Sequence, residues 1–163
     1  TEAKKSAPLT DLVEISSPLS GQVKELSQAT DPVFAQGVMG QGVLIEPSQG
    51  DLLAPVDGVV SVLFPTKHAV GIVSDQGVEM LMHIGMDTVN LEGKGFTAHV
   101  SQGDQVKAGD KLISFDIDLI KNAGYVTETP VIITNQDQYQ ADALGSLPRQ
   151  IAAGDALMTA TKI

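Results

Sequence analysis

The sequence contains no cysteine and no tryptophan, and its other aromatic residues are few. Without cysteine, disulfide bonds, thiolate nucleophiles and zinc–cysteine sites are excluded. With two tyrosines and four phenylalanines, the hydrophobic core has to be built from aliphatic side chains. The chain also lacks an apolar run that approaches the roughly 20 residues of a membrane-spanning helix, and nothing in it resembles a signal peptide. We therefore expect a soluble, cytoplasmic protein with no direct insertion into the membrane.

Basic residues are also scarce. Lysine and arginine together number 10 against 20 aspartates and glutamates, which gives a formal net charge of −10 at pH 7. This balance argues against nucleic acid as a partner, because a phosphate backbone attracts lysine and arginine, and against an anionic membrane surface. It favours a protein partner that presents a basic patch.

Length and composition predict one domain. At 163 residues with 42% hydrophobic residues, the chain can bury a substantial core. Residues 1–12 are polar and are expected to form a flexible lead, followed by a single domain over residues 13–163. The 16 glycines and 8 prolines predict many tight turns between short strands. Only residues 31–37 and 116–122 indicate short helical turns, the second capped by Asp116 or Asp118.

Two pairs of segments repeat within the chain. Residues 17–23 (SPLSGQV) resemble residues 54–60 (APVDGVV), and residues 106–113 (VKAGDKLI) resemble residues 151–158 (IAAGDALM). Neither spacing is sustained along the chain, so a solenoid is not indicated. The repeats predict an all-β, antiparallel sandwich or barrel built from two interleaved, related halves.

Two histidines, His68 and His83, are the most informative residues. Apolar and β-branched runs flank the turn-forming residues 74–77, which predicts a β-hairpin over residues 64–84. If the hairpin is centred on the second and third of these turn residues, the two histidines lie directly opposite each other. Opposed residues share one face of a sheet, with Cβ atoms roughly 4.5–5.5 Å apart. Such a pair can share a proton, a metal ion or a phosphoryl group, whereas a three-residue loop would shift the register by one.

The predicted hairpin also gives the pair an apolar floor. In the same register, Val70, Ile72 and Leu81 share the face of the two histidines. A floor of this kind excludes water, which favours phosphoryl transfer over hydrolysis.

The neighbours of the two histidines suit a phosphohistidine. A histidine nucleophile needs one unprotonated ring nitrogen, while the other nitrogen donates to a fixed acceptor. The carbonyl of Gly85 could accept this hydrogen bond from His83. The hydroxyl of Thr66 could orient His68 or hold a phosphoryl oxygen.

Other interpretations of these residues stay open. The histidines could be unrelated, one at the surface and one hydrogen-bonded in the core. They could also bind zinc, but two ligands are too few for a structural site, so a third would come from Glu79 or from a partner's carboxylate. His99 lies beside turn residues and is expected at the surface. Asp31 and Asp87 either cap turns or form an acidic rim that receives arginines from a basic partner.

The sequence contains neither a nucleotide-binding loop nor a serine hydrolase motif. The glycine-rich residues 37–42 lack the lysine of a phosphate-binding loop and precede a predicted strand instead of a helix. The chain contains no Gly-x-Ser-x-Gly motif, which a serine hydrolase of the α/β type would need.

Seven motifs carry a resemblance to one protein family, and the resemblance runs from about Ile15 to Lys162. They are SPLSGQV (17–23), DPVF (31–34), LAPVDG (53–58), FPTKHAVG (64–71), LMHIGMDTV (81–89), EGKGF (92–96) and TPVIITN (129–135). On these motifs the chain resembles the glucose-type enzyme IIA domains of the bacterial phosphoenolpyruvate-dependent sugar phosphotransferase system. Residues 124–125 depart from the family pattern.

The resemblance implies a β-sandwich with a duplicated, barrel-like topology, and no cofactor. It implies that His83 accepts a phosphoryl group on Nε2 from the histidine phosphocarrier protein and passes it to a cysteine of a sugar-specific IIB domain. His68 would hydrogen-bond the phosphoryl group and support its onward transfer. Thr66 would fix His68, and the Gly85 carbonyl would hold the Nδ1 proton of His83.

The resemblance further implies a docking face, which is an apolar depression around the histidines with an acidic rim. By position, its residues are Val33, Val38, Met39, Phe64, Leu81 and Val89, with Asp31 and Asp87 at the rim.

Two other functions remain as hypotheses. In some relatives the same face regulates a sugar permease or glycerol kinase under control of histidine phosphorylation, and zinc bridges the two histidines and a partner's carboxylate. Such a domain can also be tethered to a membrane transporter. The third hypothesis, a zinc enzyme, requires metal in the isolated protein.

Overall fold

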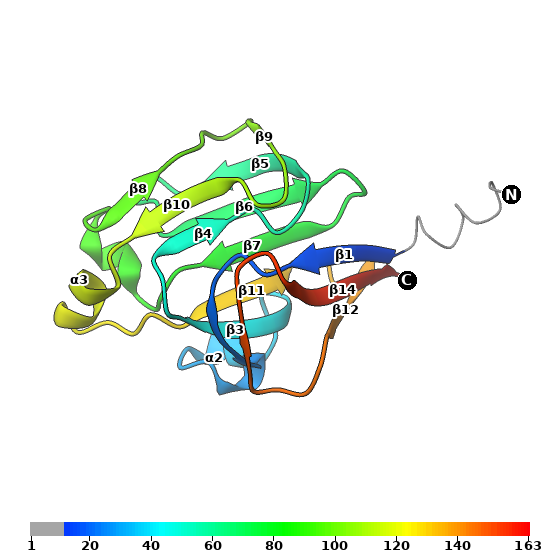
Figure 1. Ribbon diagram of the computed structural model, residues 1–163, viewed down its shortest axis with the longest axis horizontal. Coiled ribbons are helices and arrows are strands. Elements are labelled where there is room, and N and C mark those ends of the chain that lie inside the picture. The colour runs from blue at the N-terminus through cyan, green and yellow to red at the C-terminus, as the bar shows by residue number, and fades with distance from the viewer. Residues whose placement is uncertain (1–11) are drawn as a thin grey trace, which may run out of the picture.

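Short antiparallel strands dominate the structure (Figure 1). The computed structural model describes residues 12–163, so the expected lead over residues 1–12 lies outside the described residues except for Leu12, which begins the first strand. Within the described part, the strands form three sheets. No helix of these residues has both the length and the apolar character needed to cross a membrane.

The largest sheet has eight strands and all its neighbours are antiparallel. In spatial order they are β13 (Arg149–Ile151), β2 (Gly21–Glu25), β3 (Gln41–Pro47), β11 (Thr129–Ile133), β7 (Glu79–His83), β6 (Ala69–Ser74), β5 (Gly58–Leu63) and β9 (Gln105–Val106). Two antiparallel three-stranded sheets complete the fold. One contains β1 (Leu12–Ser16), β14 (Ala156–Lys162) and β12 (Tyr139–Ala143), and the other contains β4 (Asp51–Leu53), β10 (Lys111–Phe115) and β8 (Phe96–Ala98). The predicted all-β, antiparallel fold class is confirmed.

Both predicted helical turns are present. Helix α2 (Pro32–Ala35) begins after Asp31, whose carboxylate accepts a hydrogen bond from the Val33 amide at 2.9 Å. Helix α3 (Ile117–Asn122) begins after Asp116, whose carboxylate accepts from the Leu119 amide at 3.1 Å. In each case the side chain satisfies an amide that has no partner within the helix.

Two short 3₁₀ turns were not predicted. They are η1 (Leu26–Gln28) and η2 (Thr88–Leu91), and neither begins with a side-chain cap. Glu25, which precedes η1, is not a typical capping residue, so the sequence carries no start signal there. Asp87, which precedes η2, was considered as a turn cap, but its side chain makes no capping hydrogen bond.

The first internal repeat marks equivalent places in the large sheet. The repeated segments lead into β2 and β5, and each of these strands starts with a glycine, Gly21 or Gly58. A Cβ atom at either position would collide with a carbonyl oxygen of the neighbouring strand, that of Glu46 or Val73. Only glycine permits this close approach of two backbones.

The second repeat forms the same turn twice. Asp110 accepts from the Lys107 amide at 2.9 Å, and Asp155 accepts from the Ala152 amide at 3.2 Å. The strands before these turns, β9 and β13, pair with β5 and β2 at the two ends of the large sheet. The sheet therefore consists of two related halves, β13-β2-β3-β11 and β9-β5-β6-β7, which meet where β11 pairs with β7.

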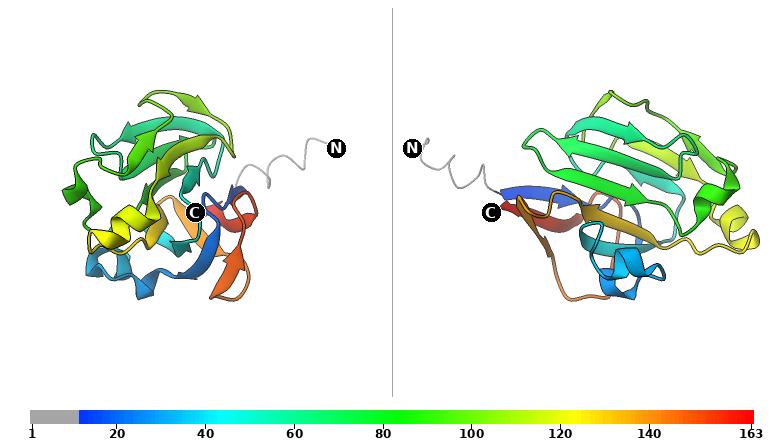
Figure 2. Two further views of the ribbon diagram at one scale, coloured as in Figure 1. Left: turned by 60° about the vertical axis from the view of Figure 1, so that its left-hand side comes forward. Right: turned by 180° about the vertical axis from the view of Figure 1, so that it is seen from behind.

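A small second core lies apart from the main one and supports the segment that contains η1 and α2. The main core fills the space between the sheets. Alternate residues of β3 and β11 point away from it, and two of them, Leu44 and Ile132, join the second core. The buried members of the second core are Leu26, Ala29, Phe34, Leu44, Met86 and Ile132. In the rear view of Figure 2, α2 lies beside β11 and away from the two chain ends.

The hairpin of β6 and β7 has a different register from the one predicted. Ala69, not His68, lies opposite His83. The amide of Ser74 donates to the carbonyl of Val78, so the loop has three residues, and its last residue, Gly77, has a φ of 106°. A glycine adopts this conformation without steric cost. The predicted direct opposition of the two histidines is therefore wrong.

The shifted register also corrects the predicted apolar floor. Val70 and Ile72 point into the main core, on the face opposite to His83. Leu81 does share the face of His83, and it packs against the second core. The floor beneath the histidine pair is therefore built by the second core and not by β6.

Candidate functional site

The side chains of His68 and His83 meet in spite of the shifted register. Their ring centroids lie 4.9 Å apart and the rings are nearly perpendicular, at 82°. His68 precedes β6 and follows Lys67, whose φ of 63° reverses the local backbone direction. Because His68 stands outside the regular strand, its side chain is not bound to the alternation of the strand. His68 is buried and His83 is partly exposed, so the pair has one ring below the surface and one at it.

The protonation of His83 follows from its hydrogen bond to Gly85. The His83 Nδ1 lies 2.8 Å from the Gly85 carbonyl oxygen, and a carbonyl can only accept a hydrogen bond. Nδ1 therefore holds the proton, and a neutral His83 has its lone pair on Nε2. Gly85 has a φ of 74°, and a Cβ there would press against Thr88 and the Val126 carbonyl. Glycine at this position is thus required by the turn that orients His83.

His68 is oriented by Thr66. The Thr66 hydroxyl lies 2.6 Å from His68 Nδ1. When the hydroxyl donates this bond, the proton of a neutral His68 lies on Nε2. The two rings then have opposite tautomers, one with a free lone pair on Nε2 and the other with a hydrogen-bond donor there.

Burial keeps both histidines neutral. Burial, followed by the charge of His83, lowers the pKa of His68 to about 4. Burial also lowers the pKa of His83, while its hydrogen bond to Gly85 and the charges of Asp31 and Asp87 act in the opposite direction. Near neutral pH, His83 therefore presents an unprotonated nitrogen.

We expect the stability of the protein to fall between pH 7 and pH 4.5 partly because of His68. Its pKa is lower in the folded chain than in the unfolded chain, so the unfolded state binds more protons below pH 6.5 and gains stability as the pH falls. The contribution is on the order of 2 kcal/mol at pH 4.5. Urea unfolding of wild type and His68→Gln at the two pH values measures it, with His99→Gln as the control. An equal loss in wild type and His68→Gln would contradict the assignment.

Aromatic and aliphatic side chains surround the pair. The ring of Phe34 lies 5.2 Å from that of His83, and the ring of Phe64 lies 5.3 Å from that of His68, centroid to centroid. Leu81 adds an aliphatic side chain on the face of His83. Phe64 and Leu81 were predicted at the site, but the role of Phe34 was missed. The sequence did offer a signal, since Phe34 ends the DPVF motif whose first residue was assigned to the rim.

The other predicted docking residues follow Asp31 or Asp87 in the sequence, with Val33 on α2 and Val89 on η2. Val33, Val38, Met39 and Val89 are exposed, and Val38 is 67% exposed. Asp31 caps α2, and Asp87 precedes η2 with a φ of 59°. Both carboxylates are close enough to His83 to influence its pKa. Two acids therefore influence a neutral histidine, and the segments that follow these acids expose aliphatic side chains.

The positions of the possible third ligands bear on whether His68 and His83 could bind zinc. Glu79 begins β7 and His83 ends it, so Glu79 lies roughly 13 Å along the strand from the histidine and does not complete a zinc site. Among residues 12–163, no three histidine or acidic side chains are arranged to hold a metal ion. With both Nδ1 atoms engaged, only the two Nε2 atoms remain, and a zinc ion there would need a carboxylate from a partner. His99 is exposed, with its Nε2 2.8 Å from the Ser114 hydroxyl.

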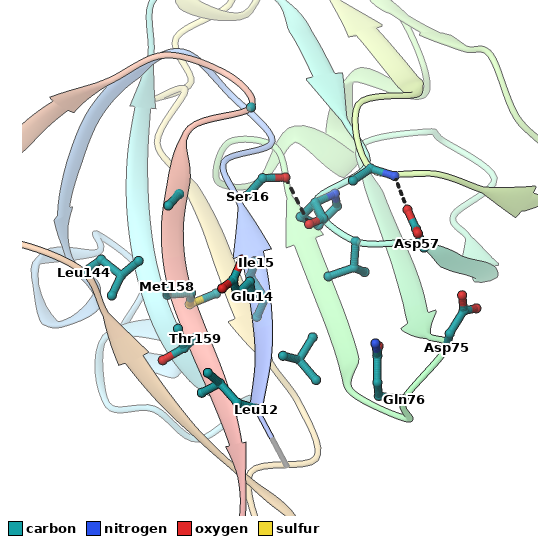
Figure 3. A pocket seen from close by; sticks show the side chains of 16 residues that line it. Leu12, Glu14, Ile15, Ser16, Asp57, Asp75, Gln76, Leu144, Met158 and Thr159 are labelled. Atoms are coloured by element: carbon teal, nitrogen blue, oxygen red, sulfur yellow. Dashed lines mark hydrogen bonds between the residues drawn. The ribbon is translucent and has the colours of Figure 1, made fainter. Parts of the chain in front are cut away.

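A cavity of about 660 Å³ lies elsewhere, between β1 and the turn that joins β6 to β7 (Figure 3). Its lining includes Asp75 and Gln76 in that turn but no histidine. The turn lies at the opposite end of the hairpin from His83, roughly 17 Å away along the strand. This cavity is therefore separate from the candidate site.

Comparison with known proteins identifies the family. The family model described as "phosphoenolpyruvate-dependent sugar phosphotransferase system, EIIA 1" matches residues 13–139. The chain belongs to this EIIA family. It is thus a phosphotransferase component of the sugar phosphotransferase system, as the sequence motifs indicated.

Two similar proteins are larger than this chain. The β-glucoside-specific EIIBCA component of the phosphotransferase system of Bacillus subtilis (strain 168) is 58% identical over 125 residues, which are 77% of this chain and 20% of that protein. The component of the same name from Halalkalibacterium halodurans is 51% identical over 162 residues, 99% of this chain and 25% of that protein. This EIIA chain therefore spans a quarter or less of the length of these two relatives.

A solved structure supports the fold assignment. The glucose permease IIA from Mycoplasma capricolum superimposes with a TM-score of 0.81 at 35% sequence identity. The match covers 91% of this chain and 95% of that one. The EIIA fold therefore accounts for nearly all of the described structure.

Proposed function

We propose that this EIIA chain is a phosphocarrier in which Nε2 of His83 accepts a phosphoryl group and passes it on. The observation that carries the proposal is the 2.8 Å hydrogen bond from His83 Nδ1 to the Gly85 carbonyl. It fixes the tautomer, so that the nucleophilic lone pair lies on Nε2. The lowered pKa keeps this nitrogen unprotonated near neutral pH.

The transfer needs no cofactor and no water. The lone pair of His83 Nε2 attacks the phosphorus of a phosphohistidine on the donor protein. The N–P bond to the donor breaks, and its electron pair returns to the donor imidazole as the new N–P bond forms on His83. Phe34, Phe64 and Leu81 around the pair exclude water, which would otherwise hydrolyse the phosphoryl group.

His68 supports the second transfer, from His83 to the next acceptor. With Thr66 donating to its Nδ1, His68 presents an Nε2–H that can donate to a phosphoryl oxygen. Such a donor, held in place before the reaction, stabilises negative charge as the phosphoryl group leaves. The distance of 4.9 Å between the two ring centroids supports this role for His68.

The surroundings of the site suit a basic donor protein, and we assign this role to the histidine phosphocarrier protein. Asp31 and Asp87 at the rim can pair with arginines, and the exposed Val33, Val38, Met39 and Val89 offer an apolar contact area. The net charge of −10 accelerates encounter with a basic partner.

The downstream acceptor in this proposal is the cysteine thiolate of a IIB domain. The EIIBCA names of the two relatives support such an acceptor within one long protein. We propose that this chain serves a transporter of the β-glucoside type and works at the cytoplasmic side of the membrane, tethered to that transporter.

The proposal is tested by intact mass spectrometry after incubation with phosphoenolpyruvate, enzyme I and the histidine phosphocarrier protein. We expect the mass of one phosphoryl group to be added, and to be lost in acid because a phosphoramidate bond is acid-labile. If the phosphocarrier is shown to be charged and this chain gains no mass, the relay is wrong. The chain would then act as a binding module that is independent of phosphorylation.

A further inference from the structure

A buried carboxylate lies close to the site without belonging to the histidine pair. Glu128 precedes β11 and is only 7% exposed. Its carboxylate accepts a hydrogen bond from the Thr30 amide at 3.1 Å and another from the Thr30 hydroxyl. Within residues 12–163, no lysine, arginine or histidine forms a salt bridge with it.

Burial of the Glu128 carboxylate opposes folding, so its two hydrogen bonds are expected to have a structural role. Removing a carboxylate from water is unfavourable when no cation compensates the charge. Both bonds of Glu128 go to one residue that lies 98 positions away in the sequence. Glu128 therefore fixes the place of Thr30 more than it stabilises β11.

Thr30 is the entry to the segment that covers His83. It directly precedes Asp31, which caps α2 and raises the pKa of His83. One turn further, Phe34 places its ring against the His83 imidazole. Helix α2 has only four residues, too few to hold its position by helix formation alone. Its position depends on the second core and on the anchor at Thr30.

Residues 126–128, which include Glu128, also contact the turn that orients His83. The carbonyl of Val126 accepts from the Met86 amide at 3.3 Å, and Met86 follows the Gly85 that orients His83. Residues 126–128 thus contact both the turn behind His83 and the segment in front of it.

We propose that Glu128 is a positioning residue for phosphoryl transfer, which acts by anchoring Thr30 so that Asp31 and Phe34 are held against His83 before the donor protein docks. The proposal rests on the proposed function for its kinetic consequence, but its structural part does not. With the anchor weakened, the segment has to be ordered during docking, and this cost reduces affinity. The chemistry at His83 is unchanged once docking is complete.

The kinetic test compares Glu128→Gln with Asp57→Asn. Asp57 serves as the control because its carboxylate also accepts from a backbone amide far away in the sequence, that of Ala108 at 2.8 Å, and lies at the cavity that is separate from the site. We expect Glu128→Gln to raise the KM for the phosphorylated phosphocarrier about tenfold with little change in kcat, and Asp57→Asn to leave both near wild type. An unchanged KM in Glu128→Gln, or an equal change in Asp57→Asn, would overturn the proposal.

A second test needs no phosphorylation. The ring current of Phe34 shifts the imidazole proton resonances of His83 in the NMR spectrum of the free protein. We expect Glu128→Gln and Thr30→Val to reduce this shift and Asp57→Asn, at the separate cavity, to preserve it. Thr30 is exposed, so Thr30→Val remains informative if Glu128→Gln folds poorly. Unaltered His83 resonances in both anchor variants would refute the positioning role, whether or not the protein is phosphorylated.

Discussion

Replacement of His83 by glutamine is expected to abolish phosphorylation of the protein. The Nε2 lone pair of His83 is the nucleophile, and an amide side chain offers no equivalent. His68 cannot take over, because it is buried and its Nε2 has the proton when Thr66 donates to Nδ1. Intact mass after incubation with phosphoenolpyruvate, enzyme I and the phosphocarrier should show the added phosphoryl group in wild type and none in His83→Gln.

A matched variant makes this result specific. His99→Gln is the same chemical change at an exposed histidine, whose Nε2 contacts only the Ser114 hydroxyl, and it should be phosphorylated like wild type. If His83→Gln still gains an acid-labile phosphoryl group, His83 is not the acceptor. A peptide map of the phosphorylated variant would then identify the residue that is.

Replacement of His68 by glutamine is expected to leave phosphorylation of His83 intact and to slow transfer of the phosphoryl group to the next acceptor. The nucleophile and its hydrogen bond to Gly85 are untouched, so His83 should still be phosphorylated. Donation to the acceptor cysteine should slow by about 10²-fold, because one pre-positioned donor to the leaving phosphoryl group is lost. Glutamine reaches the phosphoryl oxygens with a longer and less constrained side chain that Thr66 does not orient.

Rapid-quench measurement of each half-reaction tests this separation. The rate of acceptance from the phosphocarrier serves as the internal control for folding and docking. Normal donation by phosphorylated His68→Gln to a IIB domain would show that His68 has no part in the transfer. Equal losses in both directions would show that its role is structural.

Local sequence signals predicted the type and the capping of the structural elements well. Asp31 was identified at the start of a turn and Asp116 as one of two candidate caps, and the carboxylates of both accept from an amide of the helix that follows. The repeats around Gly21 and Gly58 predicted a duplicated sheet, since each glycine marks a close approach that only this residue permits. These features depend on a few neighbouring residues, which is why the sequence reveals them.

The register of the hairpin could not be predicted in the same way. Ser74, Asp75, Gln76 and Gly77 are all turn formers, so they are compatible with a loop of two or of three residues. The positive φ of Gly77 and the pairing of Ser74 with Val78 decide for three. The two histidine side chains do meet, as predicted, but not because they lie directly opposite each other in the hairpin. Their contact depends instead on the backbone conformation of Lys67, the residue before His68.

The contributions of Phe34 and Glu128 to the site are non-local. Phe34 reaches His83 from helix α2, and Glu128 reaches Thr30 across 98 positions of the chain. No periodicity or spacing indicates such contacts, because they arise from how β3, β11 and β7 lie beside one another.

The place of β11 in the sheet has a consequence for biosynthesis. This strand lies between β3 and β7, and the residues just before it hold both Met86 and Thr30. A growing polypeptide that emerges from the ribosome exposes both histidines well before it contains β11. Until residues 126–133 have been translated, neither the turn behind His83 nor the segment in front of it has its support. The histidine site is thus expected to form only once β11 has joined the sheet between β3 and β7.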